Sequence, residues 1–114
     1  MHVIDSYTFG RMTVNGQSYE SDLIIYPDRI ESAWWRSKGH IFSVEDLEKM
    51  LAAGPEVIII GSGSPGMLSV PKKAREVAAS RGVELHVKPT EAAAQLYNEI
   101  APTRKVVAGF HLTC

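Results

Sequence analysis

One short stretch of the sequence has residues whose types and spacing are typical of ligand binding. The segment GSGSPG at residues 61–66 follows an apolar run at residues 57–60 and matches the pattern G-x-G-x-x-G. In dinucleotide-binding folds, this pattern forms a turn whose N–H groups bind a pyrophosphate at the start of a helix. The candidate ligand-binding residues of this loop are Gly61, Ser62, Gly63 and Ser64.

Two features of the sequence argue against a dinucleotide site. A helix that began inside the motif would carry Pro71 in its interior, at a cost of about 3 kcal/mol. Ser69 is a better N-cap, because it places Pro71 in the first turn, where proline is tolerated. Glu84 stands at about the spacing expected of the ribose-binding acid, but it begins its strand instead of ending it. We therefore interpret the loop as a strand-to-helix turn.

A smaller anion remains an alternative ligand for this loop. Lys72 and Lys73 fall in the first turn of the following helix, where each cation opposes the helix dipole by roughly 0.3–1 kcal/mol. A bound anion would reverse that effect, although exposed lysines also tolerate it. The alternative function is thus a small-ligand protein or enzyme with an anion pocket at the loop, to which we add His40 and His111.

No other set of residues predicts catalysis. His111 and Cys114 are three residues apart, so on an extended strand their side chains point to opposite faces, and we expect no dyad unless the chain turns after Thr113. The four histidines lack the spacing of metal ligands. We expect no metal and no cofactor, and the sequence favours a protein without enzymatic activity.

The adjacent residues Trp34 and Trp35 are candidates for a partner surface. Neighbouring strand residues point to opposite faces, so one indole should pack inward and the other outward. An outward tryptophan is typical of a protein-binding surface, although the fold could also cover both. Further polar residues near the ends of the same strands could line a cleft with the glycine loop: Asp22, Tyr26, Arg36 and His40.

The elements that must position these residues follow from hydrophobic periodicity and turn signals. Runs at residues 7–14 and 17–26 meet at Asn15-Gly16, which favours a type I′ hairpin, and residues 30–36 add a third strand of a meander. Ser43 is the expected N-cap of a helix that ends near residue 51.

Strand and helix alternate in the rest of the chain. We expect strands at 57–60, 83–87 and 104–113, a helix that Ser69 caps, and a last helix that Thr90 caps. Strands 57–60 and 83–87 should be parallel neighbours joined by a right-handed crossover. The pattern predicts an α/β fold in which helices pack on a sheet.

Length and composition predict a single domain over residues 1–114. The net charge of −1 gives no general attraction to nucleic acid or to a membrane surface. No apolar run approaches the ~18 residues of a membrane span, and the first residues do not read as a signal peptide, so we expect a cytoplasmic protein. The only cysteine is Cys114, which excludes an intrachain disulfide.

Six short motifs occur in the order of a known family. They are Y-x-F-G at 7–10, G-x-x-Y-x-x-D at 16–22, W-W-R…G-H at 34–40, I-I-I-G-S-G at 58–63, T-x-x-A…Y-N at 90–98 and H-L-T-C at 111–114. Together they resemble the small Mth-type domain family of unknown function. That family includes an adipogenesis-associated protein of animals and an assembly factor for mitochondrial respiratory complex I.

The resemblance implies a three-layer α/β fold with a mixed central sheet, flanking helices and an N-terminal β-meander. It also implies a closing strand that runs antiparallel to its neighbours. Known roles in the family lie in assembly and protein interaction, without an established enzymatic activity.

The leading hypothesis is therefore a non-catalytic binding or assembly module with a protein partner, and a homodimer through the meander edge is also plausible. Ten positions match the family motifs, and we expect them to surround one pocket beside the 61–66 loop: Asp22, Trp34, His40, Gly61, Gly63, Thr90, Asn98, His111, Thr113 and Cys114.

Overall fold

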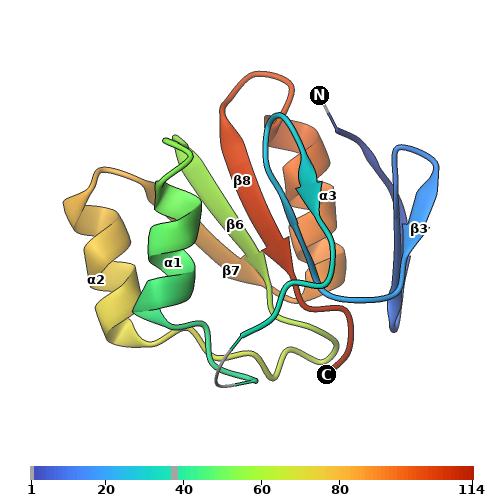
Figure 1. Ribbon diagram of the computed structural model, residues 1–114, viewed down its shortest axis with the longest axis horizontal. Helices are drawn as coiled ribbons and strands as arrows, with labels where there is room; N and C mark the ends of the chain where they lie inside the picture. Colours follow the sequence, from blue (N-terminus) through green and yellow to red (C-terminus); the bar gives the residue numbers. More distant parts are fainter. Residues whose placement is uncertain (1, 37–38) are drawn as a thin grey trace.

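A five-stranded mixed sheet forms the middle layer of the protein (Figure 1). The computed structural model describes residues 2–36 and 39–114. Its elements in chain order are β1 (Ile4–Thr8), β2 (Arg11–Val14), β3 (Gln17–Tyr19), β4 (Leu23–Ile25), β5 (Ile30–Glu31), α1 (Val44–Leu51), β6 (Val57–Gly61), α2 (Lys72–Ser80), β7 (Glu84–Lys88), α3 (Thr90–Ile100) and β8 (Val106–Phe110). In the described ranges, no helix has both the length and the apolar character that crossing a membrane requires.

The middle sheet has the strand order β5-β4-β8-β6-β7, and both of its faces are covered. Helices α1 and α2 lie on one face, while α3 and the separate β1-β2-β3 sheet lie on the other (Figure 1). Because side chains alternate along a strand, Ile59 of β6 packs in the core beneath α3, whereas Ile58 and Ile60 pack in the core beneath α1 and α2. The three-layer α/β fold that the sequence predicts is confirmed.

The closing strand β8 is antiparallel to β4 but parallel to β6. The predicted parallel pairing of residues 57–60 with 83–87 is confirmed as β6 with β7. The expectation that the closing strand runs antiparallel to its neighbours is wrong on the β6 side. Helix α3 returns the chain to the end of the sheet where β6 and β7 begin, so β8 runs in their direction.

The N-terminal strands differ in their bounds from the prediction. The Asn15-Gly16 turn is confirmed, because both residues have positive φ, 53° and 78°. However, a turn at Gly10 divides residues 7–14 between β1 and β2, and residues 17–26 divide into β3 of the small sheet and β4 of the central sheet. The expected strand 30–36 is only β5, which pairs with β4. Alternation along a run does not reveal where a chain passes from one sheet to another.

Helix α1 begins as the sequence predicts. The Asp46 N–H donates to Oγ of Ser43 at 3.2 Å, and the Ser43 N–H donates to the Asp46 carboxylate at 2.9 Å, which completes a capping box.

The other two predicted N-caps are wrong. Helix α2 starts at Lys72, and its N-cap is Pro71. Ser69 is instead extended, because its N–H donates to the His40 carbonyl at 2.7 Å and its carbonyl accepts from Phe42 N–H at 2.8 Å. Helix α3 has Pro89 at its N-cap, so Thr90 is already helical and its hydroxyl is free to bond elsewhere.

These caps give a matched pair of serine substitutions. Ser43→Ala removes the capping hydroxyl and should lower the free energy of unfolding by about 1 kcal/mol. Ser69→Ala removes an exposed hydroxyl that caps no helix, and should stay within about 0.5 kcal/mol of the wild type. Urea denaturation of both variants measures the difference. Equal losses would mean that Ser69 caps α2 after all.

Candidate functional site

The candidate site lies where the parallel strands β6 and β8 end. The two strands lead into residues 61–66 and 111–114, which therefore leave the sheet side by side. Figure 1 shows the C-terminal residues at this end of the molecule, beside the segment that joins β6 to α2. In open α/β sheets, ligands bind outside the carboxyl ends of the strands, so this edge is the place to look.

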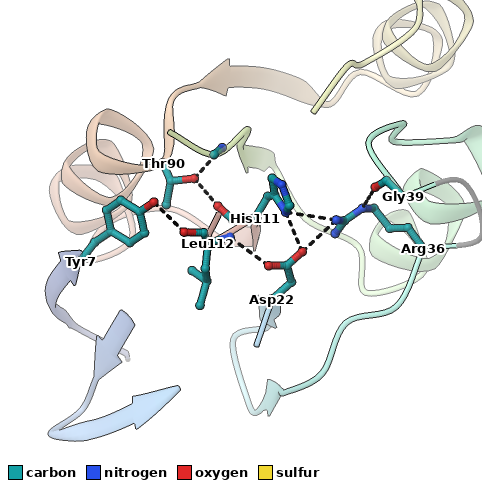
Figure 2. A network of polar contacts seen from close by, with 8 residues as sticks. Tyr7, Asp22, Arg36, Gly39, Thr90, His111 and Leu112 are labelled. Atoms are coloured by element: carbon teal, nitrogen blue, oxygen red, sulfur yellow. Dashed lines mark hydrogen bonds and ion pairs between the residues drawn. The ribbon is translucent and has the colours of Figure 1, made fainter. Parts of the chain in front are cut away.

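Three ionisable side chains meet at this edge. The Asp22 carboxylate lies between His111 and Arg36 (Figure 2). Its Oδ2 is 2.8 Å from Nδ1 of His111 and accepts a hydrogen bond of 2.8 Å from Nη2 of Arg36. Its Oδ1 accepts the Leu112 N–H at 2.9 Å. We call Asp22, Arg36 and His111 the polar cluster.

The Asp22 carboxyl group is ionised in this setting. Burial acts to raise its pKa, but hydrogen bonds from His111, the Leu112 N–H and Arg36 together hold that pKa below its ordinary value. The 2.8 Å contact between Oδ2 and Nδ1 requires a proton, which therefore sits on Nδ1 of His111. This fixes the imidazole with Nε2 directed away from the carboxylate, free to accept or to donate.

Neighbouring groups hold the Arg36 side chain in the cluster. Its Nε donates to the Gly39 carbonyl at 2.7 Å, and its guanidinium lies over the Trp34 ring at 4.5 Å. The backbone N–H of Trp34 in turn donates to the Asp22 backbone carbonyl at 2.7 Å. The cluster is buried, since Arg36 and His111 are only 9% and 5% exposed.

Three backbone N–H groups of the glycine loop already have hydrogen-bond acceptors within the protein, so they are not available to a ligand. Ser62 N–H donates to the Lys88 carbonyl at 2.8 Å, Gly63 N–H to Oγ1 of Thr90 at 2.8 Å, and Ser64 N–H to the Thr113 carbonyl at 2.9 Å. Gly61 is the buried last residue of β6. The loop therefore joins β6 to the C-terminal segment, and its N–H groups do not form a phosphate cradle.

The other predicted ligand residues fall into two groups. His40 and His111 come together, with ring centroids 5.2 Å apart in an edge-to-face contact. Lys72 and Lys73 are exposed at the start of α2, and Lys72 faces Glu76 at 4.0 Å. Figure 1 places α2 beyond α1, on the side of the molecule away from the C-terminal residues, so the helix that carries the lysines does not lie beside those residues.

Two hydroxyl groups fix the backbone of the C-terminal segment. Oγ1 of Thr90 donates to the His111 carbonyl at 2.6 Å, and the Tyr7 hydroxyl donates to the Leu112 carbonyl at 2.8 Å (Figure 2). Thr90 and Tyr7 each open one of the motifs named above, T-x-x-A…Y-N and Y-x-F-G, but the motifs do not show that either hydroxyl bonds to the C-terminal segment. Two expected residues lie elsewhere: Asn98 bonds to the backbone of Ile4, and the ring of Tyr26 lies under Arg29.

The two tryptophans take opposite environments, as the sequence suggests. Trp34 is 5% exposed and packs edge-to-face with Phe42, while Trp35 is 79% exposed. Trp34 therefore supports the site from inside, and only Trp35 is available to a partner.

Four exposed apolar residues are each in contact with residues 111–114 through their backbone or stand next in sequence to a residue that contacts them. We call the set the apolar rim: Phe9, Trp35, Ile41 and Met67, which are 62%, 79%, 39% and 59% exposed.

Backbone hydrogen bonds connect the chain at two of the rim residues, Phe9 and Met67, to the C-terminal segment. Phe9 precedes Gly10, whose N–H donates to Leu112, and Met67 donates its own N–H to Cys114. Ile41 bridges to Ser69, two residues from Met67. Among the described residues, the only other large apolar side chain with such exposure is Val3, which bonds to the Asn15 turn instead.

Comparison with known proteins identifies the family. The chain is 31% identical to the protein MT938 over the whole of both chains, with a TM-score of 0.81. It is 30% identical to a conserved hypothetical protein of Pyrococcus horikoshii OT3, over 97% of this chain and 98% of that one, with a TM-score of 0.85. A Mth938-like domain of Bordetella pertussis has the same fold at 20% identity, over 97% and 85% of the two chains, with a TM-score of 0.68.

The sequence profile of the proteins of unknown function DUF498/DUF598 matches residues 4–111, which is most of the chain. The profile match and the two relatives near 30% identity assign the chain to the same family. The chain belongs to the DUF498/DUF598 family of small Mth938-like domains, whose function is unknown.

Proposed function

We propose that this protein is a non-catalytic binding or assembly module, and that the apolar rim is its protein-binding surface. The observation that carries the proposal is that four exposed apolar residues, Phe9, Trp35, Ile41 and Met67, lie at or next in sequence to residues that contact one short segment. Scattered exposed apolar residues need no explanation, but a group of them at one end of a small domain is typical of an interaction site. Tryptophan is also the residue most enriched among interface hot spots.

The backbone beneath the rim favours binding because it is already ordered. Residues 111–114 accept hydrogen bonds from Gly10, Ser64 and Met67, so the β1–β2 turn and the β6–α2 loop are both fixed to the C-terminal segment. A surface that is rigid before it binds loses less conformational entropy on association. This supports a preformed docking surface.

The experiment compares two apolar truncations at opposite ends of the molecule. Tagged wild-type protein, Trp35→Ala and Val3→Ala are used to capture partners from a lysate of the source organism, and each captured partner is purified and titrated. A partner of the rim should bind Trp35→Ala at least ~10-fold more weakly than the wild type, which is the size of a hot-spot loss. The same partner should bind Val3→Ala with the affinity that it has for the wild type.

Two results would overturn the proposal. One is a partner that binds the wild type and Trp35→Ala equally well. The other is a partner that Val3→Ala loses to the same extent, since that effect would not be specific to the rim. Light scattering of the purified protein tests separately for the expected homodimer.

A further inference from the structure

Two nitrogen atoms of the polar cluster have no hydrogen-bond partner among the described residues. They are Nη1 of Arg36 and Nε2 of His111, and both are buried. An unpaired buried polar group costs roughly 1–3 kcal/mol, and a charged one costs more. Because native proteins pair most of their buried polar groups, these two nitrogens point to a ligand.

The two nitrogens belong to groups that are in contact. Nη2 of Arg36 lies 3.2 Å from Nδ1 of His111. In each group, the unpartnered nitrogen is two covalent bonds away from the nitrogen in that contact. The two unpartnered nitrogens therefore belong to side chains that are direct neighbours.

The charges of the polar cluster select the ligand. With Asp22 ionised, the cluster is neutral while His111 is neutral, and it carries one positive charge when His111 is protonated at both nitrogens. In the protonated state, Nη1 and Nε2 are both N–H donors, so a monoanion would neutralise the site. A carboxylate presents two acceptor oxygens in one plane, which suits the planar guanidinium.

We propose that Arg36 and His111 form a binding site for a small carboxylate, which accepts one hydrogen bond from Nη1 and one from Nε2. Asp22 is the positioning residue, since it holds both side chains. The inference goes beyond the proposed function, because it assigns a ligand to the buried cluster and not to the exposed rim.

The approach to this site is on the side of His40. The backbone of Gly63 packs closely against the His111 ring, since a Cβ built there would lie 2.8 Å from Cδ2 of His111. The ring of His40 lies edge-to-face against the ring of His111, and His40 is exposed. The carboxylate would take the place that this ring occupies.

Carboxylate binding by this route takes up a proton at Nε2. The titratable or charged groups facing His111 among the described residues are Asp22 before β4, and Arg36 and His40 from the segment between β5 and α1. The loop after β6 and helix α3 contribute Gly63 and Thr90, which do not titrate. Affinity should therefore fall as pH rises, because loss of the Nε2 proton removes one of the two hydrogen-bond donors.

The test is an NMR titration of the ¹⁵N-labelled wild-type protein with acetate. The ring nitrogens of His111 should shift saturably, with affinity at acidic pH at least ~10-fold higher than at alkaline pH. His86, which pairs with Glu84 on the edge strand β7, is the internal control and should not follow the same curve. A parallel titration with a blocked aspartate distinguishes a free carboxylate from an acidic side chain of a partner.

Two arginine variants complete the design. Arg36→Lys keeps the positive charge but removes the second guanidinium donor, and should weaken acetate binding at least ~10-fold. Arg11→Lys changes an exposed arginine and should leave it unchanged. The proposal is wrong if His111 and His86 shift together without saturation, or if affinity does not depend on pH. Both measurements are made on the purified wild-type protein with acetate alone. Their outcome therefore does not depend on whether the apolar rim binds a protein partner.

Discussion

Asp22→Ala is expected to lower the free energy of unfolding by about 3–5 kcal/mol. The carboxylate accepts hydrogen bonds from Arg36 and the Leu112 N–H, and it faces the protonated Nδ1 of His111. Its removal leaves the Arg36 guanidinium, whose side chain is 6% exposed, without a countercharge. Domains of this size are stabilised by roughly 5–15 kcal/mol, so the loss is a large fraction of the total.

The control is an ion pair of the same kind on the surface. Arg11 and Glu20 are 3.1 Å apart, but their side chains are 57% and 72% exposed. Water solvates both partners, so Glu20→Ala should cost less than ~1 kcal/mol. Urea denaturation of the two variants gives the comparison. Equal losses of unfolding free energy would show that the buried ion pair of Asp22 and Arg36 contributes no more to stability than the exposed pair of Arg11 and Glu20.

The same residue should shape the acid unfolding curve. The pKa of Asp22 in the folded protein is lowered from its ordinary value of 3.8, so the unfolded chain binds the proton more readily than the folded one. Its contribution to stability is therefore complete above that ordinary value and is lost as pH falls through the folded value. Asp22→Asn should flatten the dependence of stability on pH below about 4. A curve parallel to that of the wild type would contradict this assignment.

Gly63→Ala is expected to lower the free energy of unfolding by about 3 kcal/mol or more, from two separate causes. Gly63 has a φ of +104°, a conformation that side chains oppose. A Cβ would also lie 2.3 Å from the Thr113 carbonyl oxygen and 2.8 Å from the His111 ring. The backbone oxygen cannot rotate away, so the C-terminal segment must move.

Gly16→Ala separates the two causes. Gly16 has a φ of +78° in the hairpin turn, but nothing lies within 4 Å of its Cβ position. It carries only the backbone cost, of roughly 1–2 kcal/mol. Chemical denaturation should show a larger loss of unfolding free energy for Gly63→Ala than for Gly16→Ala. In Gly63→Ala, the amide protons of Ser64 and Met67 should also exchange faster with solvent, because both donate hydrogen bonds to the displaced segment. Equal losses would mean that the segment adapts without cost.

The substitutions at Asp22 and at Gly63 both act on contacts of the C-terminal segment after β8. Gly63 lets the loop after β6 approach the chain after β8, and this contact positions His111 beside Asp22. The polar cluster and the apolar rim thus depend on one backbone contact. A change at Gly63 should therefore reduce acetate binding and partner binding together, whereas Trp35→Ala should affect only the partner.

Local patterns were sufficient for part of this structure. The Asn15-Gly16 turn, the capping box at Ser43 and the buried strand at 57–60 each depend on residues within a few positions of one another. The opposite environments of Trp34 and Trp35 also follow locally, because neighbouring residues of extended chain point to opposite sides. The sequence by itself therefore determined the α/β class and the order of the major elements, and it favoured one inward and one outward indole while leaving open that the fold covers both.

Tertiary structure decided the site, because its partners are far apart in the chain. Asp22 and His111 are 89 positions apart, and they meet only because β8 lies between β4 and β6 in the sheet. The same placement gives the glycine-loop N–H groups to Lys88, Thr90 and Thr113, which removes the phosphate cradle that the local motif suggested. A hydrogen-bonding group takes whichever partner the fold brings near, and strand order, which local periodicity does not encode, determines that partner.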